Sequence, residues 1–269
     1  MQVNRYNFLR WFNDQVDPNL PELPYAYHRD KGACGYMPIA PPAEAMNFYI
    51  NSPVGFDYED FPNLRLGMYR ADGTLVAPSL GPLQQLELGD GTYHIYCSLV
   101  VPAAEYGIHY FRIYRNSTGE ELLRSSYVLV RTDMEDLYGS TIYCRFRHDR
   151  FFYNTYYAEL PGFYQQFRLN LSVADEQVES EEEVYREVST GKTRTLNSYE
   201  SKAVKIESYY FDQSAHEATA LMFRHSYVEL NSRQYSLKSA YKYTPNPMSK
   251  YTKGEAEIYD LSFASVNRC

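Results

Sequence analysis

Residues Glu181 to Leu230 have the sequence EEEVYREVSTGKTRTLNSYESKAVKIESYYFDQSAHEATALMFRHSYVEL, and this stretch decides the fold of the C-terminal half. Val184 to Val188 and Lys192 to Leu196 flank Ser189-Thr190-Gly191, where the glycine can supply the positive φ of a tight hairpin. From Ser201 to Phe211 the residues alternate with the period of a β-strand. The first part of the stretch therefore predicts a hairpin whose second arm is followed by a further strand.

The second part of the stretch predicts a helix and another hairpin. Ser214 followed by Glu217 fits a capping box, in which each side chain bonds a backbone N–H at the start of a helix. Four apolar residues fall on one face of this helix, which at about ten residues must pack on a sheet to be stable: Ala215, Ala218, Leu221 and Met222. Tyr227 to Leu230 and Gln234 to Lys238 then predict two strands joined by Asn231-Ser232-Arg233.

The composition bounds the class of protein. The 269 residues are 44% hydrophobic and 22% charged, as expected for a folded chain with room for two domains. The formal net charge of -8 argues against nucleic acid as the main partner, because gripping phosphates requires a basic face. The sequence has no apolar run of signal-peptide or membrane-span length, so we expect folding in a cytoplasm and no membrane partner. The cysteines form no CxxC pair and are expected as free thiols: Cys34, Cys97, Cys144 and Cys269.

Residues 1–35 are expected to form an N-terminal arm with a short helix at Asn7 to Gln15. Such an arm either packs along the first domain or reaches a neighbouring subunit, and the sequence favours neither. Three aromatic side chains seldom stay exposed without a partner, so the arm contributes three candidate interface residues: Phe8, Trp11 and Phe12.

Residues 36–134 predict a β-sandwich of the immunoglobulin-like or jelly-roll type. Several short strands occur here with turn signals between them, and no window has a helical period. The pattern is clear where Phe48 and Ile50 point to one side of a strand, and again before the hairpin signal Ala71-Asp72-Gly73. Arg131 to Ser140 has no clear period and is expected to be a linker. Residues 135–269 then form a β-rich second domain with one packed helix, so the fold class is mainly β.

The sequence offers no set of residues that predicts a catalytic or metal site. A run of carboxylates could bind calcium or form a glycosidase pair, but it lacks the alternation and the glycine of a calcium loop, so we expect a solvated acidic loop: Asp175, Glu179, Glu181, Glu182 and Glu183. His94 and Cys97 are expected on opposite faces of a strand, and His216 and His225 on opposite sides of a helix. We therefore expect no enzyme, no cofactor and no metal, and the ligand-binding residues stay unknown.

The densest polar cluster lies on and after a predicted strand and supplies four further candidate interface residues: Arg145, Arg147, His148 and Arg150. Arginines on a strand can bind a phosphate or a carboxylate, and both a subunit contact and a solvated strand face fit this cluster. The chain also has 29 Tyr and a single Trp. An excess of tyrosine is typical of surfaces that meet other proteins or sugars, although aromatic residues also favour strands.

Several segments of the chain occur in a characteristic order. They are strand residues 141–149, FRLNL (167–171), EEEVY (181–185) before a glycine turn and a long strand, the helix HEATALMFRH (216–225) and SYVEL (226–230). In this order they resemble the tail and virion structural proteins of double-stranded DNA phages that infect Bacteroidetes, including crAss-like phages. The earlier segment YFRIYRNSTGEELLRSSYVLV (110–130) is similar to the end of the N-terminal module in that family. The resemblance covers residues from about 40 to 269 and rests on pattern and order.

The resemblance implies a non-enzymatic part of a virion, assembled in the bacterial host cytoplasm as a symmetric ring or collar in the neck, tail or baseplate. Its partners would be further copies of itself, as a homo-oligomer, and other virion proteins such as portal, tail or fibre subunits. The alternative is a carbohydrate-binding module or adhesin at the host surface, in which tyrosines stack on sugars. A hydrolase that uses the acidic run is a third hypothesis.

Overall fold

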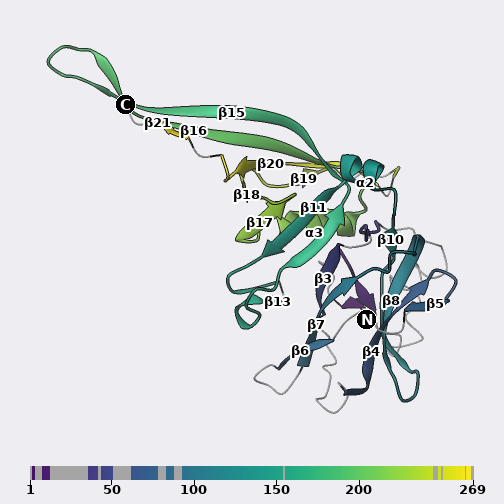
Figure 1. Ribbon diagram of the computed structural model, residues 1–269. Coiled ribbons are helices and arrows are strands. Elements are labelled where there is room, and N and C mark those ends of the chain that lie inside the picture. Colours follow the sequence, from purple (N-terminus) through teal and green to yellow (C-terminus); the bar gives the residue numbers. More distant parts are fainter. Residues whose placement is uncertain are drawn as a thin grey trace.

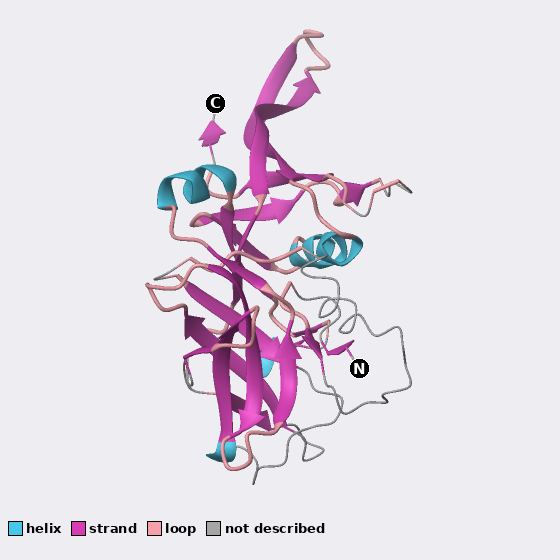
Figure 2. Cartoon of the chain, turned by 90° about the vertical axis from the view of Figure 1, so that its right-hand side faces the viewer, coloured by secondary structure: helices cyan, strands magenta, loops and turns pink. Residues whose placement is uncertain are grey.

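The computed structural model describes residues 2–3, 8–12, 36–41, 44–50, 62–77, 83–87, 93–153, 155–244, 248–249, 251–263 and 265–267. Within these ranges the chain is mainly β, with two large antiparallel sheets and two α-helices (Figures 1 and 2). The predicted fold class, a β-sandwich type with one packed helix in the C-terminal half, is confirmed.

The first sheet has seven strands and belongs to the N-terminal half. In order across the sheet these are β1 (Gln2–Val3), β2 (Trp11–Phe12), β9 (Glu121–Ser125), β8 (Gly107–Arg115), β4 (Leu64–Arg70) and β5 (Leu75–Ala77), with β10 (Val128–Val130) also paired with β8. The hairpin predicted between β4 and β5 is present, and Gly73 has a φ of 88° in its turn. Residues 8–12 contain β2 and no helix, so the helix expected at Asn7 to Gln15 is wrong there, and its remaining residues lie outside the described ranges.

The second sheet has twelve strands and runs through both halves of the chain. Its order is β15 (Leu171–Arg186), β16 (Thr193–Ser208), β20 (Gly254–Asp260), β18 (Arg233–Leu237), β17 (Tyr227–Leu230), β11 (Ile142–Arg147), β14 (Gln165–Leu169), β3 (Ala45–Ile50), β7 (Tyr93–Val100) and β6 (Gln84–Glu87). Two short strands complete it, β19 (Lys242–Tyr243) on β20 and β21 (Ser265–Asn267) on β16. The pair β14 and β3 joins strands from both predicted domains, through Gln166 and Asn47.

The N-terminal half is a sandwich because β3 and β7 of the second sheet face β4 and β8 of the first. Phe48 of β3 and Phe111 of β8 are fully buried, and their rings stack with centroids 6.5 Å apart. Both side chains belong to one hydrophobic core that continues into the C-terminal half. Burial of aromatic rings of this size supplies the largest share of the free energy that holds two such sheets together.

The C-terminal part of the second sheet closes on itself. β14 and β15 are separated only by Asn170, and they pair with β11 and β16 respectively, while the strands between β11 and β16 are neighbours in turn. Ile142, Ile206 and Ile258 are buried inside the closed part. The helix α3 (Gln213–Met222) belongs to the same core through the apolar residues that its period predicts, which are Ala215, Ala218 and Met222.

The start of α3 corrects one expectation. The N-cap is Asp212, whose Oδ1 accepts a hydrogen bond of 2.8 Å from the backbone N–H of Ala215, so the capping box predicted from Ser214 and Glu217 is wrong. The Ser214 hydroxyl instead donates to Asp212 Oδ1 and accepts from Arg10. Either side chain could cap by its chemistry. Asp212 does so because Ser214 is already within the helix.

Three further segments differ from the sequence-based expectations. Arg131 to Ser140 contains a short helix, α2 (Met134–Ser140), where an irregular linker was expected. The strand β9 (Glu121–Ser125) was not predicted. The expected acidic loop is part of the long strand β15, because its carboxylate residues pair with β16 across the whole ribbon. A small separate sheet, β12 (Phe151–Phe152) with β13 (Thr155–Tyr156), precedes a 3-10 helix at Tyr157–Glu159.

Candidate interaction surfaces

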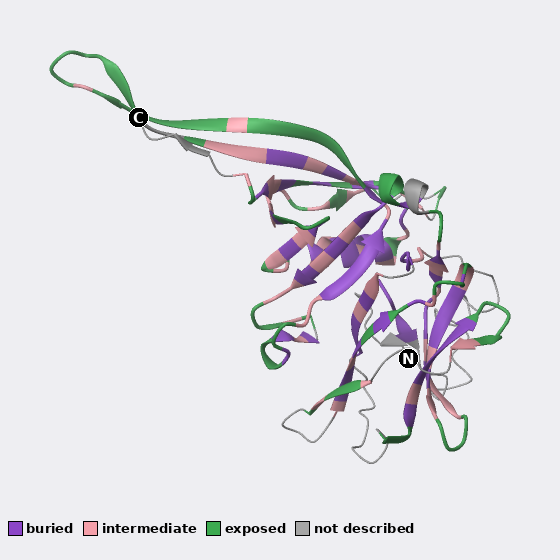
Figure 3. Cartoon of the chain, viewed as in Figure 1, coloured by how far each residue is buried: buried purple, intermediate pink, exposed green. Residues whose placement is uncertain are grey.

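A long two-stranded ribbon, β15 with β16 (Leu171 to Ser208), projects from the body of the protein (Figures 1 and 3). Each strand has 16 residues. The tip is closed by two backbone hydrogen bonds, from Glu187 N–H to the Lys192 carbonyl at 2.8 Å and from Gly191 N–H to the Glu187 carbonyl at 2.7 Å. Gly191 has a φ of 68°, as the predicted turn requires. The sequence thus places a tight, regular tip at the end of two unusually long strands.

Most of the ribbon is in contact with solvent. From Ser172 to Arg186 every residue of β15 is exposed except Glu179, which is partly buried. β16 pairs with β20 and β21 along the edge that faces away from β15. The outer edge of β15 pairs with no strand within the described residues. At about 3.3 Å per residue, the stretch from Asp175 to Arg186 extends over about 35 Å. Isolated two-stranded ribbons are only marginally stable in water, so this one gains stability when a further surface covers it.

The side chains of the ribbon are acidic with scattered apolar residues. Glu179, Glu181 and Glu183 share one face, because residues two apart on a strand point the same way. Lys238 bonds Glu179, whereas Glu181 forms no ion pair within the described part of the chain. Three valines are exposed by 61%, 52% and 100%: Val178, Val184 and Val188. Charged residues on an edge strand protect a monomer from edge-to-edge aggregation, and this is the simplest explanation of the glutamates taken alone. It does not explain why the three valines are exposed.

The second surface is the outward face of β11, where the structure brings together two of the predicted interface residues. Arg145 and Arg147 lie over the ring of Tyr164, at 4.3 Å and 5.4 Å from its centroid. Arg145 also donates to Glu229 of β17 over 3.4 Å, and its side chain is one-third exposed. Tyr227 packs edge-on against Tyr164, at 5.3 Å between centroids. We call this surface, together with the exposed Arg150 three residues after Arg147, the arginine face.

The other two residues of the predicted cluster lie just beyond β11. His148 stacks on Phe152, with ring centroids 4.5 Å apart and planes within 3°. Its Nδ1 accepts a hydrogen bond of 3.2 Å from the backbone N–H of Arg150. Neither Arg147 nor Arg150 has a carboxylate partner in the described ranges. Two guanidinium groups are therefore available to an incoming anion, while His148 supports the turn that carries Arg150.

An ion pair that sequence patterns did not reveal extends this surface toward the N-terminal half. Arg168 of β14 is buried, forms a salt bridge with Glu44, and donates to Thr141 Oγ1 over 3.1 Å. Its guanidinium lies 4.5 Å from the centroid of Tyr138 and 5.8 Å from that of Tyr143. Glu44 and Arg168 are 124 positions apart, so only the tertiary fold brings them together. This pair stabilises the junction of the two halves.

The predicted aromatic anchors of the N-terminal arm are placed inside this chain. Phe8 is 4% exposed and lies 5.8 Å from Phe167 between ring centroids, and Trp11 is fully buried 5.3 Å from Phe48. The side chain of Phe12 lies outside the described residues. Arg10 fixes the segment by donating to Ser214 Oγ over 2.7 Å. Phe8 and Trp11 are thus covered by their own subunit, and the exposed interface candidates are the arginines.

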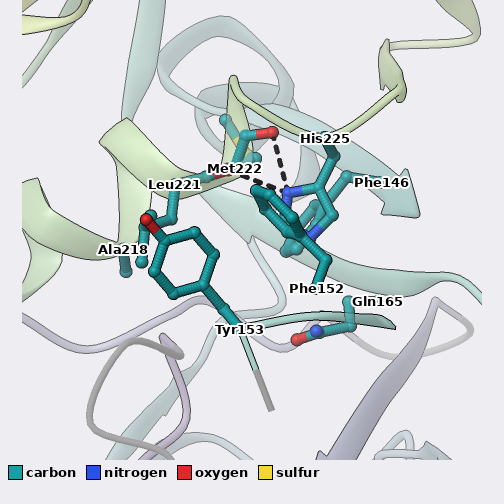
Figure 4. Close-up of a pocket in the computed structure, with 8 residues that line it drawn as sticks. All are labelled: Phe146, Phe152, Tyr153, Gln165, Ala218, Leu221, Met222 and His225. Carbon is teal, nitrogen blue, oxygen red and sulfur yellow. Dashed lines mark hydrogen bonds between the residues drawn. The ribbon is translucent and has the colours of Figure 1, made fainter. Parts of the chain in front are cut away.

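A small cavity lies beside the C-terminal end of α3 and is lined by aromatic, aliphatic and polar side chains, among them His225 (Figure 4). Its volume is about 10 Å³, which suffices for about one water molecule. His225 Nδ1 faces the carbonyls of Leu221 and Met222 at 2.8 Å and 3.1 Å, so this nitrogen carries the proton. Its Nε2 accepts from the Tyr157 hydroxyl at 3.1 Å. Burial lowers the pKa of His225 to about 4. His225 is therefore a neutral imidazole with both ring nitrogens hydrogen-bonded, and its role is structural.

His216 is bonded in the same way on the other side of the helix. Its Nε2 faces the Thr252 carbonyl at 3.1 Å and therefore donates, while Nδ1 accepts from the Tyr241 hydroxyl at 2.7 Å. Burial lowers the pKa of His216. His216 and His225 thus belong to separate clusters, as their spacing predicts. His94 bonds the Tyr49 hydroxyl at 2.5 Å and lies on the strand face opposite to the buried Cys97.

A groove of about 310 Å³ lies where the ribbon leaves the body. It is lined by both apolar and polar side chains: Ile142, Val173, Glu176, Ile206, Leu230, Asn231, Arg233 and Tyr235. The turn at its rim is the predicted hairpin, with Asn231 at a φ of 46° and Ser232 at 67°. Asn231 Oδ1 accepts from the backbone N–H of Tyr143 at 2.9 Å, which ties the turn to β11.

Across the described ranges, no group of three or more His, Cys, Asp or Glu side chains is placed to hold a metal ion. Cys97 and Cys144 are buried free thiols whose pKa burial raises. None of the helices in the described part of the chain is long and apolar enough to cross a membrane. Comparison with protein-family models gives no match, and comparison with curated proteins gives none either.

Proposed function

We propose that this chain is a non-enzymatic structural protein of a phage virion, which assembles as a symmetric ring or collar in the neck, tail or baseplate. The observation that carries the proposal is the projecting β15–β16 ribbon, because it exposes long strands and three valines that a solitary subunit gains nothing by exposing. Subunits that offer an extended element to a different surface of a neighbour make head-to-tail contacts, and such contacts close into rings when the rotation permits.

The resemblance of the C-terminal segments to phage tail and virion proteins supports the same proposal. In this account the partners are further copies of the chain and neighbouring virion proteins such as portal, tail or fibre subunits. Assembly takes place in the cytoplasm of the bacterial host, and the finished protein resides in the virion. Nucleic acid is not the main partner, because the net charge of -8 disfavours contact with phosphates.

Electron microscopy of the purified full chain tests the proposal. We expect negatively stained fields to contain closed rings of one diameter, and averaged images to show one rotational symmetry. A preparation that contains only particles of single-subunit size at every concentration would contradict it. The same preparation fixed with a mild cross-linker should then give a ladder that stops at the ring number.

Carbohydrate binding is a second candidate, favoured by exposed tyrosines. Tyr209 and Tyr210 are adjacent, 62% and 53% exposed, and their ring centroids lie 5.0 Å apart. Exposed aromatic rings of this kind can stack on a sugar, and the Lys253 ammonium 5.6 Å from the Tyr210 ring could bond its hydroxyls. Calorimetric titration with host polysaccharide distinguishes this role: heat of binding that Tyr209→Ala and Tyr210→Ala abolish would favour it, and absence of heat would reject it.

A further inference from the structure

We propose that the acidic face of the ribbon in one copy binds the arginine face of the next copy. This inference rests on the proposed function, since it names the two surfaces that would join neighbouring subunits. The ribbon contributes Glu181 and Glu183, with Val184 and Val188 around its tip. The arginine face contributes Arg145, Arg147 and Arg150.

The two faces match in charge and in spacing. Glu181 and Glu183 are two residues apart on β15, and Arg145 and Arg147 are two residues apart on β11. Residues two apart on any strand point the same way and repeat about every 6.6 Å. Two carboxylates can therefore meet two guanidinium groups at the same time, and each such contact can be bidentate. Val188, which is fully exposed at the tip, would add apolar contact area.

The arginine face is suited to receive a partner. Arg147 and Arg150 have no carboxylate within salt-bridge distance in the described ranges. Arg145 has one carboxylate partner there, Glu229, and the N–O distance of 3.4 Å is long for a hydrogen bond. The ring of Tyr164 beneath Arg145 and Arg147 holds both guanidinium groups in place before a partner arrives. Such preorganisation reduces the entropy lost when the contact forms.

A second copy is the occupant because the ribbon cannot serve its own subunit. Pairing of β16 with β20 and β21, together with the bond from Lys238 to Glu179, fixes the base of the ribbon and directs its tip away from the body (Figure 1). The tip and the arginine face are different surfaces of the same chain. A contact between them is therefore heterologous, and it repeats from each subunit to the next.

Charge reversal on the full-length chain tests this contact. The ribbon variant carries Glu181→Lys and Glu183→Lys, and the face variant carries Arg145→Glu and Arg147→Glu, the two arginines whose spacing on β11 matches these carboxylates. A control with Asp72→Lys and Glu87→Lys makes the same change in net charge as the ribbon variant at two exposed sites of the N-terminal half. Far-UV circular dichroism verifies folding, and sedimentation velocity measures assembly.

We expect the ribbon variant and the face variant each to weaken assembly by at least about 10-fold in dissociation constant, given the coupling measured for close charge pairs at interfaces. The chain that carries all four reversals should assemble again, because opposite charges then face each other, and the control should behave like the original chain. The inference is overturned if the ribbon and face variants assemble normally, or if the chain with all four reversals stays monomeric. Either result leaves the proposed function standing. An original chain that never assembles overturns both.

Discussion

Replacing Trp11 with alanine should destabilise the chain strongly, because this side chain holds the N-terminal segment in the sandwich core. Trp11 is fully buried and packs on Phe48 at 5.3 Å between ring centroids. Truncation of a buried tryptophan costs about 3–5 kcal/mol of unfolding free energy, which corresponds to a fall in Tm of about 10 °C for a chain of this size. The replacement Trp11→Phe is the matched control.

The control should cost about 1 kcal/mol, for two opposing reasons. It removes part of the apolar ring, but it also removes the Trp11 Nε1–H, which is buried and has no hydrogen-bond partner among the described residues. Urea unfolding followed by far-UV circular dichroism measures both variants, since Trp11 is the single tryptophan and fluorescence would lose its reporter. A loss below about 1 kcal/mol for Trp11→Ala would refute the reasoning and would mean that the segment is free to act as an arm.

Three further predictions concern stability. Because burial lowers the pKa of His225 to about 4, the unfolded chain takes up a proton between pH 6.5 and pH 4 that the folded chain does not. The unfolding free energy is therefore fully present above pH 6.5 and should fall by about 3 kcal/mol toward pH 4, at about 1.4 kcal/mol per pH unit. Urea unfolding measures this profile, and His225→Gln should flatten it between these two pH values. Gly254→Ala should cost about 1–3 kcal/mol, because the new Cβ would lie 2.2 Å from the Tyr241 hydroxyl, and an unchanged Tm would contradict the close packing. Glu44→Gln should cost about 2 kcal/mol in thermal unfolding by leaving the Arg168 guanidinium buried without its anion, and a neutral effect would mean that the pair is not needed.

Local signals in the sequence predicted much of the fold. Alternation around Phe48 and Ile50 located β3, and Gly191 and the Asn231-Ser232 pair located the two hairpins of the C-terminal half. These features depend on neighbours in sequence, so a single chain contains all the information they need. The buried face of α3 was predictable for the same reason.

Long-range features were not predictable from local patterns. The pairing of Gln166 with Asn47 joins the two halves across more than a hundred residues, and neither strand has a signal that names its partner. The short helix α2 has too few residues to display a period. Glutamate disfavours strands, so the acidic run predicted a loop. Pairing with β16 along almost the whole of β15 overrides that preference.

The interaction surfaces were only partly predictable. The arginines of β11 stood out by their density, but the sequence did not show that Tyr164 lies beneath them. Phe8 and Trp11 were expected to need a partner, and the core of their own chain provides it. The projection of the ribbon had no local signal at all, because it follows from where β20 and β21 stop covering β16.

Sedimentation velocity of the unmodified full chain, across a range of concentrations, tests the central claim most directly. We predict one discrete species at a whole-number multiple of the mass of one chain, whose size does not grow further as concentration rises, because a closed ring has no free contact left. A single species at the mass of one chain, up to the highest concentration, would contradict it.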